Sequence, residues 1–216
     1  MPSGQKTATK AAPRRPAKPS ARAWQRMLSG RRLDLLDPSP LDIEIEDIAQ
    51  GLSRVARWNG QTEGDWAFTV AQHSLLVEDL AGRLKPNIAE RWRLAALLHD
   101  AAEYVVGDLI SPFKAAVGAD YKSFEVRLAS AVHVRFGLPA ALPESLTALI
   151  KRADHAAAYL EATQLAGFEE AEGRRYFGQV RGTAAAKILH LRLEPLPPAE
   201  AKAAFLARFE ALSQNA

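Results

Sequence analysis

The chain has 216 residues, of which 48% are hydrophobic, and a net charge of +3. This length suits one domain with a buried core, and the absence of cysteine excludes disulfides and thiolate metal sites. No stretch approaches the roughly 18 apolar residues of a membrane helix, and the first residues lack the apolar core of a signal peptide. We therefore expect a soluble, cytoplasmic protein that does not bind membranes.

Basic charge is concentrated at the start of the chain. Nine Lys and Arg residues precede Asp34, whereas residues 34–216 carry 19 basic and 25 acidic residues. The proline- and alanine-rich composition of residues 1–33 predicts a basic, disordered tail, followed by one domain over 34–216. The acidic body is poorly suited to nucleic acid, so a contact of that kind is expected only through the tail. A solvated extension is the simpler interpretation of the tail.

The body of the chain is predicted to be helical. Alternation of Leu41, Ile43 and Ile45 with acidic residues predicts a short hairpin near residues 41–46. Apolar periodicity and terminating Gly or Pro residues predict helices over 46–57, 69–84, 88–105, 120–136, 144–166, 184–191 and 198–213. The chain contains no glycine-rich phosphate loop and no alternation of strands with helices. The expected fold class is all-α, with that one hairpin.

His99 and Asp100 end the apolar run of residues 94–98. An imidazole and a carboxylate are costly to bury unless they have partners. Glu103 follows four residues after His99, on the same face of the predicted helix. Acidic groups clustered on one face are unfavourable unless a cation or a proton neutralises them. This pattern predicts a metal site.

Two other predicted helices carry suitable ligands, His73 and Asp154. Helical bundles build metal sites from side chains that converge from facing helices. Two imidazoles and two carboxylates suit one divalent cation of intermediate hardness, and Mn, Co, Ni, Fe, Zn and Mg are all candidates.

The succession of His73, His99-Asp100 and Asp154 resembles the pattern of HD-domain metal-dependent phosphohydrolases. The stretch HDAAEYVVGDLISPFK, from His99 to Lys114, is similar to the 5'-deoxynucleotidase branch, which has HDxxE followed by Gly-Asp-Leu and Pro-x-Lys. The resemblance covers roughly residues 45–165. It implies an HD-domain helical bundle that removes phosphate from a (deoxy)nucleoside monophosphate, and it allows a homodimer.

The resemblance also implies a role for each matching residue. The metal ligands would be His73, His99, Asp100 and Asp154. Two further carboxylates, Glu103 and Asp108, would position or deprotonate water or contact the sugar hydroxyl. Substrate binding would fall to Arg57, Trp58 and Lys114, because a guanidinium can form two parallel hydrogen bonds with a phosphate.

Other interpretations of the same residues remain open. An HD hydrolase of an alarmone or a cyclic nucleotide would use the same metal ligands with a different pocket. A non-catalytic HD module for regulation or binding would keep the scaffold and use the basic tail as a tether. Arg57 and Trp58 also have a structural interpretation, as an ion pair and a core aromatic residue, and Lys114 has one as a solvated lysine.

Overall fold

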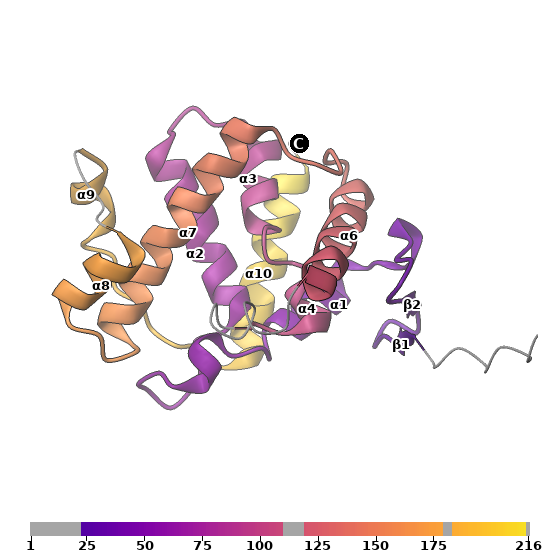
Figure 1. The fold of residues 1–216 in the computed structure, drawn as a ribbon, viewed down its shortest axis with the longest axis horizontal. Helices are drawn as coiled ribbons and strands as arrows, with labels where there is room; N and C mark the ends of the chain where they lie inside the picture. Colours follow the sequence, from indigo (N-terminus) through magenta and orange to yellow (C-terminus); the bar gives the residue numbers. More distant parts are fainter. Residues whose placement is uncertain (1–22, 110–118, 179–182, 215–216) are drawn as a thin grey trace, which may run out of the picture.

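The computed structural model describes residues 23–109, 119–178 and 183–214. These residues form a helical bundle with a two-stranded hairpin at one end (Figure 1). The predicted all-α class is confirmed. Within the described ranges, no helix combines the length and the hydrophobicity that crossing a membrane requires.

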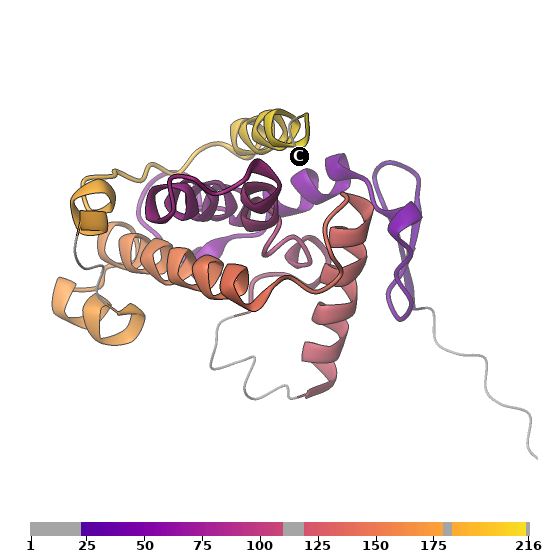
Figure 2. The same cartoon turned by 90° about the horizontal axis from the view of Figure 1, so that it is seen from above.

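Helix α2 (Val70–Leu84) lies at the centre of the bundle. It packs against α7 (Glu144–Gln164) on one side and α10 (Pro198–Ser213) on the other, with α3 (Glu90–Leu97) beside it. Figure 2 shows α2 and α3 as a middle layer between α10 and α7. Because α2 is covered on several sides, its polar side chains must find their partners inside the protein.

The remaining helices surround this centre. They are α1 (Ile45–Leu52), α4 (Glu103–Val106), α6 (Ala119–Arg135), α8 (Glu170–Phe177) and α9 (Thr183–Ile188). Helix α1 packs against α4 and α10, while α8 lies against α7 and α9 against α2. Helix α8 is absent from the predicted elements.

The hairpin lies earlier in the chain than predicted. Strand β1 (Trp24–Arg26) pairs antiparallel with β2 (Arg32–Asp34). Leu33 is fully buried, and the Ser29 backbone N–H and hydroxyl donate to the Asp47 carboxylate on α1, at 2.9 and 2.5 Å. The prediction of disorder is therefore wrong for residues 24–33, because apolar burial and Asp47 anchor the hairpin to the bundle. Residues 1–22 lie outside the described residues.

The hairpin predicted near residues 41–46 is also wrong. A 3-10 helix, η1 (Pro40–Asp42), occupies its start, and α1 begins at Ile45. The apolar alternation there reflects a turn that buries Ile43 fully and leaves Leu41 71% exposed. Such a turn gives the same two-residue pattern as a strand.

The helix predicted over 46–57 ends early, at Leu52. Ala56 then forms an antiparallel bridge with Thr69, and a 3-10 turn, η2 (Arg57–Gly60), follows. Trp58 and Asn59 have φ values of 56° and 52°, in the left-handed region that is uncommon for residues other than glycine. This turn brings Arg57 and Trp58 to the start of α2.

Candidate metal centre

His99 and Asp100 lie in a turn between two helices. Helix α3 ends at Leu97, residues 98–102 form the turn, and α4 begins at Glu103. The predicted single helix over 88–105 is therefore wrong. His99 Nδ1 lies 2.9 Å from the Ala96 carbonyl oxygen, which would accept from the Asp100 N–H if the helix continued. Because a carbonyl can only accept, Nδ1 carries the proton and His99 Nε2 presents a lone pair.

His73 lies on the buried side of α2 and has no exposed surface. Its Nδ1 is 2.5 Å from Glu161 Oε1 on α7. Its Nε2 is 3.4 Å from Asp100 Oδ2 and 3.3 Å from Asp154 Oδ1. The two ring nitrogens therefore face different surroundings.

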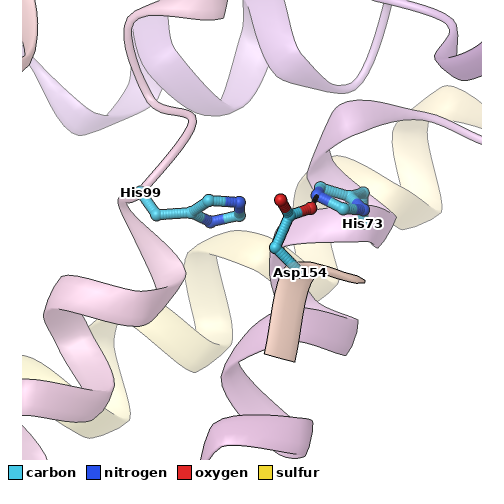
Figure 3. Close-up of side chains that lie close together, drawn as sticks. All are labelled: His73, His99 and Asp154. Carbon is cyan, nitrogen blue, oxygen red and sulfur yellow. Dashed lines mark ion pairs between the residues drawn. The ribbon is translucent and has the colours of Figure 1, made fainter. Parts of the chain in front are cut away.

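The Nε2 atoms of His73 and His99 are both buried and lack a hydrogen-bond partner among the described residues. Ligand atoms of His73, His99 and Asp154 lie within 4.8 Å of one another (Figure 3). Asp100 Oδ2 is 3.1 Å from His99 Nε2, so the second carboxylate reaches the same place. Two unpartnered imidazole nitrogens beside two carboxylates are a donor set that suits a divalent cation.

The charges of this cluster depend on one another. Burial and the nearby Arg57 lower the pKa of His73, but Glu161, Asp100 and Asp154 outweigh them and raise it well above its usual value. Burial raises the pKa of both Asp100 and Asp154, but the imidazoles beside them lower both pKa values below the usual range. The site therefore keeps its carboxylates ionised and attracts positive charge.

Glu161 is a site residue that was not predicted from the sequence. Its side chain is fully buried, and its Oε2 accepts hydrogen bonds from Arg57 Nε at 3.1 Å and Trp58 Nε1 at 2.9 Å. Burial raises its pKa, but His73 and Arg57 lower the pKa to about 2, so Glu161 is ionised. It follows Asp154 by seven residues, which is two helical turns on one face of α7. That spacing is the signal that could have identified it.

Arg57 connects two carboxylates. Its Nη1 is 2.9 Å from Asp108 Oδ2, in addition to the bond from Nε to Glu161. The Arg57 side chain is 13% exposed and that of Asp108 is 8% exposed, so this ion pair is largely shielded from water. The structure thus brings together Asp108, predicted as catalytic, and Arg57, predicted to bind substrate.

The other predicted residues differ in how the structure places them. Trp58 packs against Phe168 and Phe177, with ring centroids 5.6 and 5.5 Å apart. Glu103 is the first residue of α4 and is 2% exposed. Lys114 lies outside the described residues.

Comparison with known proteins places the chain in a family. The family model of the HD domain matches residues 70–159. An uncharacterized protein of Rhodobacter capsulatus is 62% identical over 199 residues, covering 90% of this chain and 97% of that protein. The uncharacterized protein YfdR of Escherichia coli is 28% identical over 173 residues, covering 80% of this chain and 86% of that protein. The chain belongs to the HD-domain family.

A solved structure also aligns with the chain. It is the cyanophage S-2L HD phosphohydrolase DatZ bound to dA and one catalytic Zn²⁺ ion. The alignment has a TM-score of 0.47 and 19% sequence identity, and it covers 81% of this chain and 98% of that chain.

HD domains bind a divalent metal ion, and His73, His99 and Asp154 form a group that could hold one. The cofactor prediction is therefore confirmed at the level of a divalent metal.

Proposed function

We propose that the protein removes the phosphate group from a (deoxy)nucleoside monophosphate, with a divalent cation held by His73, His99, Asp100 and Asp154. The observation that carries this proposal is the pair of buried, unpartnered Nε2 atoms beside two carboxylates. Leaving buried polar atoms without partners destabilises a fold. A cation bound between them would satisfy these atoms.

A divalent ion in such a site would lower the pKa of water and offset the negative charge of a phosphoryl group. The protein would supply the proton acceptor. Glu103 suits that role, because it is a buried carboxylate three residues after Asp100. Asp108 is paired with Arg57, so we assign it to positioning rather than to proton transfer.

Arg57 is the proposed phosphate-binding residue. Burial lowers the pKa of Arg57, but Glu161 and Asp108, and to a smaller extent Asp100 and Glu103, raise it. Its Nε bonds the same Glu161 carboxylate that contacts the proposed ligand His73, so one carboxylate separates the guanidinium from a proposed metal ligand. Its Nε and Nη1 donate to Glu161 and Asp108, whereas Nη2 has no hydrogen-bond partner among the described residues. Nη2 is therefore the donor group available to a phosphate oxygen.

The nucleotide assignment rests on the similarity of the stretch from His99 to Lys114 to the 5'-deoxynucleotidase branch. The aromatic group of Trp58, Phe168 and Phe177 lies next to Arg57 and offers apolar surface to a sugar or a base. We therefore place the nucleoside on the side of the site where Trp58 lies.

The test is phosphate release from a panel of ribo- and deoxynucleoside monophosphates, each with Mn²⁺, Co²⁺, Ni²⁺, Zn²⁺ or Mg²⁺. We expect release from at least one monophosphate in wild-type protein and none above background in Asp100→Ala. Including an alarmone and cyclic nucleotides in the panel tests the alternative hydrolases. Metal binding without turnover of any substrate in the panel would contradict the proposed activity and favour a regulatory module.

A further inference from the structure

We propose that Glu161 is a positioning residue that orients two parts of the site: the imidazole of His73 and the turn that carries Arg57 and Trp58. This inference rests on the proposed function, since it concerns how the same site is held. Glu161 is fully buried on α7, and its two oxygens point to different partners. Oε1 faces His73, and Oε2 faces Arg57 and Trp58.

Oε1 of Glu161 orients the imidazole of His73. Glu161 Oε1 lies 2.5 Å from His73 Nδ1, while Oε2 accepts from Arg57 and Trp58, so the carboxylate acts as the acceptor and the His73 proton lies on Nδ1. His73 Nε2 is then the nitrogen that faces Asp100 and Asp154, and its lone pair becomes available to a cation that replaces the second ring proton. A carboxylate that accepts from the second nitrogen of a metal-binding histidine fixes the tautomer and the ring orientation. Glu161 is placed to do this for His73.

Oε2 of Glu161 holds the turn at η2. Trp58 and Asn59 adopt left-handed backbone conformations that cost of order 1–3 kcal/mol each for residues other than glycine, so other contacts must hold them. Oε2 accepts from both Arg57 Nε and Trp58 Nε1. These two bonds tie the strained turn to α7. The same carboxylate that orients His73 therefore also places the Arg57 guanidinium.

The substitution Glu161→Gln separates these tasks with little change in shape. A carboxamide has one acceptor oxygen and one NH₂ group. If its oxygen faces His73, its NH₂ meets the donors of Arg57 and Trp58. If the amide is reversed, its NH₂ donates to His73 Nδ1 and moves the imidazole proton to Nε2, where it blocks the metal side.

The matched control is Glu78→Gln. Glu78 is also a buried carboxylate, 3% exposed, and it pairs with Arg93 and Arg208 rather than with a proposed ligand. Its loss removes a buried charge without altering the metal site. A destabilised fold alone would therefore affect both variants.

The experiment is calorimetric titration of Mn²⁺ into metal-free wild-type protein and both variants, without substrate. Because positioning residues of this kind contribute about 10- to 100-fold to metal affinity, we expect that loss in Glu161→Gln and an unchanged affinity in Glu78→Gln. Equal Mn²⁺ affinity in all three proteins would overturn the role of Glu161 and leave the proposed function standing. Wild-type protein that binds no Mn²⁺ would overturn the metal site itself, and with it the proposed function.

A second measurement needs no variant and covers the case in which Glu161→Gln does not fold. In Zn²⁺-bound wild-type protein, nitrogen NMR of the histidine rings should show His73 protonated at Nδ1, with that proton protected from exchange by the buried Glu161 carboxylate. A His73 ring with its proton on Nε2 would overturn the proposal.

Discussion

Glu78 and Glu161 are both buried glutamates with basic partners, but the surroundings of those partners differ. Glu78 is 3% exposed and joins α2 to Arg93 on α3 and Arg208 on α10. Arg208 binds it with two nitrogens, at 2.9 and 2.7 Å. Glu161 is fully buried and joins α7 to Arg57 and His73. Both carboxylates are compensated by buried or partly buried cations.

The two networks differ in where the partners of each glutamate lead. Arg93 and Arg208 have side chains 27% and 31% exposed, so the Glu78 network ends at the protein surface. The Glu161 network leads inward, to a His73 Nε2 that has no hydrogen-bond partner among the described residues. A buried charged side chain alone therefore does not identify a functional site, because it can equally well join packed helices. The feature that distinguishes the candidate site is a buried ring nitrogen that has no hydrogen-bond partner in the described part of the chain.

The largest effect that this comparison predicts is for Asp100→Ala. Removing a proposed ligand should lower Mn²⁺ affinity and phosphate release by more than the roughly 100-fold upper range for an indirect contact. Glu78→Gln should retain both. Titration calorimetry and a phosphate-release assay measure the two quantities, and an Asp100→Ala protein with wild-type Mn²⁺ affinity would remove Asp100 from the ligand set.

A second prediction concerns stabilisation by metal. An ion present at 100 times its dissociation constant should raise the free energy of unfolding by about 2.7 kcal/mol. Urea unfolding with and without Mn²⁺ checks this in wild-type protein and in His99→Ala, which lacks one of the two unpartnered nitrogens. The increase should vanish in His99→Ala. The same increase in both proteins would mean that the ion binds elsewhere.

A third prediction separates stability from metal binding. Glu78→Gln leaves Arg93 and Arg208 without their carboxylate and should lower the free energy of unfolding by about 1–3 kcal/mol. The partial exposure of both arginines favours the lower part of this range. Urea unfolding of metal-free protein measures it. A loss of Mn²⁺ affinity in this variant would show that the two networks are coupled.

The smallest effect is expected from His133 on α6, which belongs to neither network. Burial lowers the pKa of its imidazole, and the Ala140 backbone acts in the opposite direction. The unfolded chain therefore binds this proton more readily than the folded one. The stability that neutral His133 confers is complete above its ordinary pKa of 6.5 and decreases as the pH falls through the lower folded-state pKa. Stability of His133→Leu should vary less with pH over this interval, and an unchanged slope would contradict this.

Sequence patterns predicted most helices because long amphipathic segments carry a strong periodic signal. The prediction over 198–213 agrees with α10, and the one over 69–84 differs from α2 by a single residue. Helix α8 was missed because Gly173 interrupts a charged segment. A Cβ at Gly173 would lie 2.7 Å from Thr163 Cγ2, so glycine there serves close packing against α7. Tertiary packing of that kind leaves no local signal.

The sequence predicted the site residues that are recognisable by their type and spacing. It did not predict those whose role depends on contacts with residues distant in the chain. His73, His99, Asp100 and Asp154 carry a recognisable spacing, and the structure brings them together. At the end of α3 the Ala96 carbonyl accepts from the His99 ring, a contact that periodicity does not register. Glu161 reads as an ordinary helical glutamate until Arg57, 104 residues away, is placed against it.

The most direct test of the central claim is the metal content of purified protein, measured by elemental analysis after exposure to Mn²⁺ and dialysis. Wild-type protein and Glu78→Gln should each retain a single equivalent per chain, and His99→Ala should retain none. Wild-type protein without bound metal, or a His99→Ala protein with as much as wild type, would contradict a cation site between His73 and His99.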